Sequence, residues 1–214
     1  MIVPRILLLV LLASATSLMA ATADIRVISP KEPVAGESQD ALSVKWWQWA
    51  ASFSYAESPV SDLSGERCGA GQEGNVWFLA GTYASKATRR TCRVPAGKAL
   101  FFPVINYIVM PQNCSGCLTC EQAVATAHGM TDEPMGLFME LDGKPVAGLK
   151  EHRVVSPACF NMAARAKGAP KIEPSASDGY WVALHPLAKG EHTLRFGGSL
   201  PSLRQELIYT LIVE

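Results

Sequence analysis

The segment Ala99-Leu-Phe-Phe-Pro-Val-Ile105 is apolar at every position, and so is the segment Val76-Trp-Phe-Leu-Ala80. Successive side chains of a β-strand point to opposite faces of its sheet, so a strand of this composition needs apolar cover on both faces. In a sandwich the opposite sheet covers one of them. The two segments therefore predict two packed sheets with a further layer outside, and Pro103 predicts a bend or an edge within the first strand.

An apolar stripe upstream predicts the helix that forms this outer layer. Leu42, Trp46, Trp49 and Phe53 follow one another at spacings of four, three and four residues. Side chains at these spacings share one face of a helix. We therefore expect an amphipathic helix over about residues 39–53, with its tryptophans packed on the sheet.

Most of the remaining chain predicts strands. Apolar or alternating segments bounded by turn residues occur at 24–28, 136–141, 152–156, 180–184, 191–197 and 207–213. Asp142-Gly143 is a favourable pair for a tight hairpin turn. Thr119 and Gln122 have the spacing of a capping box and predict a short helix near 119–128, which Gly129 can end.

Together these elements define the expected fold class. Many short strands separated by glycine and proline are typical of a sandwich or a barrel. We expect a mainly β protein: a sandwich of two sheets, jelly-roll-like or immunoglobulin-like, with an N-terminal aromatic helix and one short helix near 119–128. No internal repeat or linker interrupts residues 24–214, which we interpret as one mainly β domain.

Residues 1–23 have the layout of a secretory signal peptide. Arg5 supplies a positive charge, residues 6–13 form an unbroken apolar run, and Ala21-Thr-Ala23 is a small-x-small cleavage site. The apolar run is shorter than the roughly 20 residues that span a bilayer. We expect cleavage after Ala23, a secreted or periplasmic location, and no membrane span in the mature chain.

Charge and composition argue against some classes of partner. The chain has 19 basic and 19 acidic residues, and no stretch of five like charges occurs. Binding to nucleic acid or to an anionic membrane surface uses clustered positive charge, so neither partner is expected. Hydrophobic residues make up 49% of the chain and charged residues 18%, which is typical of a compact globule and not of a disordered segment.

The cysteines predict structural disulfides. Six lie beyond the predicted signal peptide: Cys68, Cys92, Cys114, Cys117, Cys120 and Cys159. Disulfides persist in the compartments that exported proteins reach. We expect Cys68 to pair with Cys92, because the two bracket the apolar strand 76–80. Cys159 is then expected to pair with one of Cys114, Cys117 and Cys120, and which one stays open.

The cluster from Cys114 to Cys120 also permits other chemistry. Three thiolates at this spacing can begin an iron–sulfur or zinc site, but the ferredoxin pattern needs a fourth cysteine three residues on, followed by proline. Here Glu-Gln-Ala follows Cys120. Cys114 and Cys117 form a CxxC pair, which can exchange disulfides, although the βαβ context of thioredoxins is missing. Structural disulfides are the favoured interpretation, and no metal or cofactor is expected.

Trp47 and Gln48 are the positions that packing explains least. Trp47 lies about 100° around the predicted helix from the stripe that holds Trp46 and Trp49. Many secreted sandwiches bind sugars on flat, exposed aromatic rings, so Trp47 and Gln48 are candidates for ligand binding. A second packing face of the helix is the alternative explanation.

Other candidate ligand-binding residues lie on predicted strands. Alternation places His192 on the inward face of its strand with Leu194 and Phe196, where it is either a satisfied buried histidine or part of a pocket. The segment Asp178-Gly-Tyr-Trp181 adds a carboxylate and two aromatic rings. The complete candidate ligand-binding set is Trp47, Gln48, Asp178, Tyr180, Trp181 and His192.

Five segments carry a resemblance to known sequences. They are Lys45-Trp-Trp-Gln-Trp-Ala50, Val76-Trp-Phe-Leu-Ala-Gly-Thr82, Cys92-Arg-Val-Pro-Ala-Gly-Lys-Ala-Leu-Phe-Phe-Pro103, Asp178-Gly-Tyr-Trp181 and Gly190-Glu-His-Thr-Leu-Arg-Phe-Gly-Gly198. Together they resemble a group of uncharacterised exported bacterial proteins, over about residues 36–213. The resemblance implies export and a shared fold, and it brings no activity and no catalytic residue.

Two functions are compatible with these features. The first is a non-catalytic binding or cell-envelope interaction module, whose partner is a small molecule, a glycan or an envelope protein. The alternative is a metal-independent secreted hydrolase with a glycosidase-like carboxylate pair, for which Asp178, Glu140 and Glu66 are candidates. An open aromatic groove without convergent acids favours binding. Two carboxyls that face each other in a deep pocket, one with a raised pKa, favour the enzyme.

Overall fold

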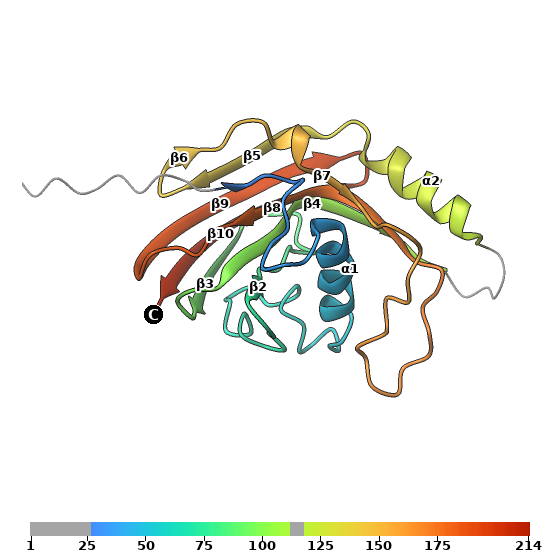
Figure 1. Cartoon of the computed structure of the whole chain (residues 1–214), viewed down its shortest axis with the longest axis horizontal. Helices are drawn as coiled ribbons and strands as arrows, with labels where there is room; N and C mark the ends of the chain where they lie inside the picture. Colours follow the sequence, from blue (N-terminus) through green and yellow to red (C-terminus); the bar gives the residue numbers. More distant parts are fainter. Residues whose placement is uncertain (1–26, 112–117) are drawn as a thin grey trace, which may run out of the picture.

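The computed structural model describes residues 27–111 and 118–214, and within these ranges two five-stranded sheets pack face to face (Figure 1). The first sheet has the order β1-β8-β4-β2, with β7 also paired to β8; its strands are β1 (Val27–Ile28), β2 (Val76–Phe78), β4 (Ala99–Val109), β7 (Arg153–Val155) and β8 (Ala176–Leu184). The second has the order β3-β10-β9-β5-β6; its strands are β3 (Thr88–Val94), β5 (Met135–Leu141), β6 (Lys144–Pro145), β9 (Gly190–Leu200) and β10 (Leu203–Val213). The predicted two-sheet sandwich is confirmed.

The strand that is apolar on both faces, β4, lies between β8 and β2 in the first sheet. It runs antiparallel to β8 along most of its length but parallel to β2 only over Ala99–Phe101, so at Pro103 the β2 side of the strand is already an edge, as predicted. The proline also coincides with a shift of register between Pro103 and Ile105. The Gln205 side chain donates from Nε2 to the carbonyl oxygens of Pro103 at 3.0 Å and Val104 at 2.6 Å. A side chain of the second sheet therefore satisfies the main chain at this irregularity.

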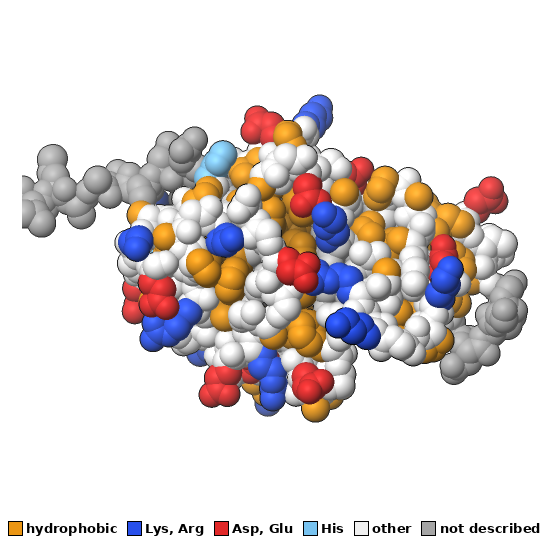
Figure 2. All heavy atoms as spheres, turned by 60° about the horizontal axis from the view of Figure 1, so that its bottom comes forward, with side chains coloured by type: hydrophobic (Ala, Val, Ile, Leu, Met, Phe, Trp, Pro, Cys, Tyr) orange, Lys and Arg blue, Asp and Glu red, His pale blue; other side chains and the backbone are white. Residues whose placement is uncertain are grey.

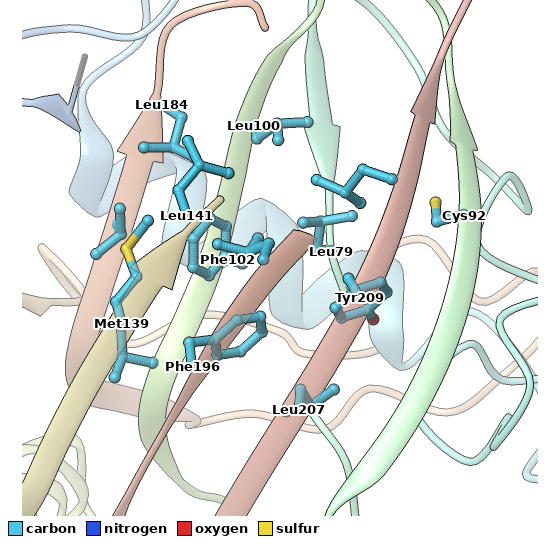
Figure 3. Packing of buried hydrophobic residues seen from close by; sticks show 14 of the residues in the cluster. Leu79, Cys92, Leu100, Phe102, Met139, Leu141, Leu184, Phe196, Leu207 and Tyr209 are labelled. Atoms are coloured by element: carbon cyan, nitrogen blue, oxygen red, sulfur yellow. The ribbon is translucent and has the colours of Figure 1, made fainter. Parts of the chain in front are cut away.

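Apolar side chains of both sheets fill the space between them (Figure 3). Phe102 of β4 meets Phe196 of β9 with ring centroids 4.6 Å apart, and Phe196 stacks in turn near Tyr209 of β10. These rings are buried. Their contact across the two sheets is the packing that the alternating strands predict.

Helix α1 (Gln39–Ala50) supplies the expected outer layer (Figure 1). Trp46 and Trp49 are buried against the face of the first sheet that is turned away from the second. The Trp46 ring lies 5.4 Å from that of Trp181, and the Trp49 ring 5.7 Å from that of Phe78. The helix ends before Phe53, the predicted last member of the stripe, although that ring still contacts Trp49.

Helix α2 (Cys120–Thr131) begins with the predicted capping box. Thr119 accepts a hydrogen bond from the Gln122 backbone, and the Gln122 side chain accepts one from the Thr119 backbone. The predicted end at Gly129 is wrong. The helix continues to Thr131, whose hydroxyl donates back to the helix at Ala127 and His128. The helix contacts β4 and β8 at one end of the first sheet (Figure 1).

Strand β3 is the longest element that the sequence did not predict. Its residues alternate between buried and exposed, but the buried ones include Thr88 and Arg90, so the apolar pattern is broken. The Arg90 guanidinium donates to five oxygen acceptors: Val60 O, Asp62 O, Ala80 O, Gly81 O and Tyr209 Oη. These bonds tie the loop after α1 and the loop after β2 to the second sheet.

The predicted hairpin turn is present. Asp142 and Gly143 adopt φ values of 51° and 74° in the turn that joins β5 to β6, as a two-residue hairpin of this type requires. A short 3-10 helix, η1 (Leu149–His152), which the sequence did not predict, then leads into β7 and includes His152, the first residue of the predicted strand 152–156.

Two disulfides are present in the described chain. Cys68 is bonded to Cys92 as predicted, and Cys159 is bonded to Cys120, one of its three expected partners. Cys114 and Cys117 lie outside the described residues, as do the predicted signal peptide and the first part of the predicted strand 24–28. No helix within the described ranges has the length and apolar composition to cross a membrane.

Candidate functional site

The six candidate ligand-binding residues do not converge on one place. Trp181 and Tyr180 lie in the two core clusters, with exposed fractions of 0% and 3%. Trp181 stacks on Phe101 with centroids 5.3 Å apart on the α1 side of the sheet. Tyr180 faces the other side, where its hydroxyl donates to the Thr131 carbonyl oxygen at 3.1 Å. Both rings are packed in the interior of the protein.

Asp178 is the buried member of an ion-pair network. Its carboxylate has an exposed fraction of 0% and accepts bonds from Arg153 Nε at 3.0 Å and Nη2 at 2.8 Å. His128 Nδ1 lies 3.2 Å from the same carboxylate. Arg153 also donates from Nη1 to Asp132 at 2.7 Å. The network thus ties α2, β7 and β8 together through one arginine.

Electrostatics in this network oppose acid catalysis. The hydrogen bond from Arg153 lowers the pKa of Asp132, with smaller Coulombic contributions from His128 and Arg153. The hydrogen bond to Asp178 raises the pKa of Arg153, so the guanidinium stays charged. A glycosidase needs one carboxyl with a raised pKa, whereas here both carboxylates are paired with the same cation. Glu140, another candidate acid, lies on the second sheet near Arg195.

Gln48 and His192 are each occupied by other contacts. Gln48 donates from Nε2 to the Asn161 carbonyl oxygen at 3.2 Å. His192 does share a face with Leu194 and Phe196, but both of its ring nitrogens have polar partners: Asp142 Oδ2 at 2.8 Å and the Ala188 carbonyl oxygen at 2.9 Å. His192 therefore anchors the β5–β6 turn to β9.

The environment of His192 favours its protonated form. Burial lowers the pKa of the ring, but the hydrogen bonds to Asp142 and to Ala188 and the charge of Asp142 outweigh burial, so the net change is upward. This histidine is distant in the fold from Trp47, which lies on the outer helix α1.

Trp47, in contrast, lines an open groove with a volume of about 380 Å³. The groove lies beside the second half of β4, with α1 on one side and the turn between β9 and β10 on the other. Its lining residues are Trp46, Trp47, Val60, Gly81, Thr82, Tyr83, Asn106, Tyr107, Ile108, Met110, Ser202, Leu203 and Gln205. The site thus draws on both sheets and the outer helix.

The groove lining is uncharged. Among the described residues that form it there is no aspartate, glutamate, lysine, arginine or histidine. Charges of both signs are interspersed over the face of the molecule in Figure 2, so a continuous uncharged lining distinguishes this hollow. Three other hollows in the described chain include charged side chains, and Trp47 lines none of them.

Asn106 gives the groove a polar group without a partner. Its exposed fraction is 6%, yet within the described chain Nδ2 has no hydrogen-bond acceptor. Buried donors are nearly always paired with protein or water. Nδ2 has almost no surface open to solvent, so a ligand atom could accept its hydrogen bond, and remove the cost of the unpaired donor of about 1–3 kcal/mol, only after the side chain turns this nitrogen toward the groove.

The aromatic rings of the groove are held in place or project at its rim. The indole of Trp47 packs edge-on against Trp46, with centroids 5.1 Å apart, and its N–H is bonded to Ser177. Tyr83 has an exposed fraction of 61% and stacks beside Tyr55 with centroids 6.2 Å apart. The fixed ring of Trp47 and the exposed ring of Tyr83 therefore offer apolar faces to a ligand in the groove.

Of this site the sequence pointed to Trp47 alone. Asn106 is a polar residue in an otherwise apolar strand, and this is a weak signal that could have been used. Tyr83 follows a turn and Ser202 precedes a strand, so neither has a local pattern that marks a site. They meet Trp47 only because three distant segments converge.

Comparisons with known proteins give no family assignment. No family model matches the chain, and the search of curated proteins found no match. One solved structure that is similar is described as "Structure of PbICP-C in complex with falcipain-2". The match has 9% sequence identity and a TM-score of 0.30, and it covers 66% of this chain and 100% of that chain. A likeness at this level indicates neither a shared fold nor a shared function.

Proposed function

We propose that this protein is an exported, non-catalytic binding module and that the groove beside Trp47 takes an uncharged ligand. The observation that carries the proposal is the composition of the groove. It combines an oriented indole ring, hydroxyl and amide side chains such as those of Thr82 and Asn106, and a described lining without charged side chains. Pockets that bind small ligands are mostly apolar with a few well-placed polar groups.

The positions of the acids favour binding over the hydrolase alternative. Asp178 and Asp132 share Arg153 and lie outside the groove lining. A hydrolase of the glycosidase type needs two carboxyls that flank the substrate, one of them protonated. The groove offers aromatic faces, hydroxyls and an amide, which are suited to holding a ligand. Small molecules, glycans and envelope proteins are the ligand classes compatible with it.

The proposed location rests on the cysteines and the N-terminal sequence. The disulfides Cys68–Cys92 and Cys120–Cys159 suit an oxidising compartment. Residues 1–23 have the composition of a secretory signal. Secretion or a periplasmic location follows from the two together as part of this proposal.

A fragment screen by NMR tests the proposal across several classes of compound. The ¹⁵N-labelled protein is titrated with matched sets of neutral, cationic and anionic fragments, each containing aromatic, amide and polyhydroxyl compounds. We expect neutral compounds to shift the Trp47 indole and Asn106 side-chain resonances, and charged analogues to shift them less. Shifts that concentrate at Asp178 and Arg153, or no shifts at the groove with any set, would overturn the proposal.

A pair of arginine substitutions tests whether fragments bind at the groove or elsewhere on the surface. Ser202→Arg places a long cation at an exposed position of the groove lining, so it should weaken binding of neutral fragments about tenfold or more. Thr193→Arg introduces the same side chain at an exposed position of β9, eight residues along the strand from the β9–β10 turn that lines the groove. This control should bind as the unmodified protein does.

A further inference from the structure

We propose that the occupant of the groove is an extended, uncharged peptide segment that adds as a further strand to the open edge of β4. This inference rests on the proposed function and specifies its ligand class. The observation that favours a peptide is that main-chain N–H and C=O groups of β4 are unpaired along the groove.

The edge of β4 opens because its neighbour ends early. Strand β2 pairs with β4 only at Ala99–Phe101, followed by one further bond from Leu79 N to the Phe101 carbonyl oxygen at 3.1 Å. The chain after β2 then leaves β4. The Gln205 side chain donates hydrogen bonds to the carbonyl oxygens of Pro103 and Val104. Beyond Val104, no described residue pairs with this edge.

The open part of the edge extends from Ile105 to Val109. On its other side, each of these residues is in register with β8, from Tyr180 to Ala176. In an antiparallel pair the N–H and C=O groups of alternate residues point away from the partner strand. Part of the main chain of residues 105–109 therefore faces the groove with its donors and acceptors unpaired. An edge of this kind is a template for another strand.

The walls of the groove have the spacing of a strand site. Trp47 belongs to the layer outside the first sheet, and Leu203 belongs to the second sheet on its other side. A strand added beside β4 would direct successive side chains alternately toward these two walls. Five residues of open edge correspond to roughly 14 Å of strand, so a peptide of about five residues would pair along it.

The lack of charged side chains in the described lining limits which peptide sequences fit the groove. Because none of the described lining residues is charged, a charged peptide side chain would lose water without gaining an ionic partner. Apolar side chains suit the walls near Trp47 and Leu203. A saccharide could also stack on Trp47, but it has no regular series of N–H and C=O groups to pair with β4.

The test uses a mixture of six-residue peptides, acetylated and amidated, with Val, Ile, Leu, Phe or Tyr at alternate positions and Ser or Thr between them. Binding should slow amide hydrogen exchange at alternate residues between 105 and 109 by about tenfold or more. Peptides from the mixture that bind are then resynthesised with N-methyl groups on alternate nitrogens, in each of the two possible registers. One register should abolish binding, because it removes the donors that face β4, and the other should retain it.

Three outcomes would overturn the inference. The first is that no peptide of the mixture slows exchange at residues 105–109, and the second is that both N-methylated registers bind equally well. The third is that a neutral oligosaccharide such as cellohexaose shifts the Trp47 indole while no peptide slows exchange at the edge. If neutral fragments still shift Trp47 in these cases, the proposed function stands and the peptide class alone is wrong. If no compound perturbs the groove, both proposals fail.

The two arginine variants also show whether the peptide binds at the groove. Ser202→Arg should abolish peptide-dependent protection of residues 105–109. Thr193→Arg, toward the other end of β9, should leave it unchanged. Loss of protection in both variants would indicate a general change of fold and would contradict peptide binding at the groove.

Discussion

The indole nitrogen of Trp47 donates a hydrogen bond to Ser177 Oγ at 2.7 Å, although the two residues are 130 positions apart in the sequence. Ser177 is fully buried at the start of β8, so the bond attaches the outer helix to the first sheet at the groove. It also fixes the plane of the ring that the groove presents.

Removing the Ser177 hydroxyl should make the Trp47 indole ring more mobile while leaving the fold intact. Ser177→Ala should lower the free energy of unfolding by about 1 kcal/mol and broaden or shift the Trp47 indole resonance. Denaturant titration and NMR spectra measure the two effects. Ser85→Ala, at an exposed position, is the matched control and should change stability by less than about 0.5 kcal/mol. An unchanged indole resonance in Ser177→Ala would contradict the positioning role.

The neighbouring tryptophans should differ strongly in their contribution to stability. Trp46 is buried and its N–H is bonded to the Leu79 carbonyl oxygen at 3.0 Å, so Trp46→Ala should cost about 3–5 kcal/mol. Trp47 is only half-buried, and Trp47→Ala should cost clearly less. Urea titrations of both variants decide the matter. Equal losses would mean that Trp47 is a core residue and not a groove residue.

The two disulfides should make similar contributions to stability. The sequence separations are 24 for Cys68–Cys92 and 39 for Cys120–Cys159, and closing loops of this size stabilises a fold by about 3.5–4 kcal/mol in the chain-entropy model. Each double Cys→Ser variant should therefore lose about that much. Non-reducing peptide mapping provides an independent check. A peptide that joins Cys159 to Cys114 or Cys117 would refute the pairing.

Elements whose pattern lies within one segment were predictable from the sequence. The stripe through Trp46 and Trp49 identified α1, and the capping box at Thr119 identified the start of α2. The pairing of Cys68 with Cys92 followed from the strand between them. In each case the physical cause is local: a helical period, a cap geometry or a short chain separation.

The remainder depends on contacts between distant segments. Strand β3 was missed because Arg90 is buried there, and its acceptors come from other parts of the chain. Asp178 and Trp181 are near neighbours in sequence, but they belong to opposite faces of β8, so they cannot share one site. The groove exists because β2 ends while β4 continues. The relative lengths of two strands that are apart in the sequence cannot be predicted from the pattern of either strand alone.

Arg90 should be among the most sensitive positions of the chain. Its guanidinium satisfies five buried oxygens, including the Tyr209 hydroxyl at 2.7 Å. Arg90→Ala would leave several of these acceptors without a donor, so the free energy of unfolding should fall by at least about 3 kcal/mol. The exposed neighbour Arg89 is the matched control, and Arg89→Ala should change stability by less than about 0.5 kcal/mol. Thermal and denaturant unfolding that rank the two variants alike would contradict this role.

The contribution of His192 to stability should depend on pH with a defined sign. Burial lowers the pKa of His192, but the bonds to Asp142 and Ala188 outweigh it and raise the pKa above its ordinary value of about 6.5. A group whose pKa is raised on folding stabilises the native state fully below the unfolded pKa, and this stabilisation is lost as pH rises through the folded pKa. The difference in free energy of unfolding between the unmodified protein and His192→Asn should therefore be largest at pH 5 to 6, below the unfolded pKa, and shrink as the pH rises through the folded pKa. His152 titrates with the opposite sign, because burial lowers its pKa, but it is present in both proteins and cancels from the difference. Denaturant titrations between pH 5 and 9 measure the profile, and a difference that stays constant or grows with pH would show that the His192–Asp142 contact does not stabilise the charged ring.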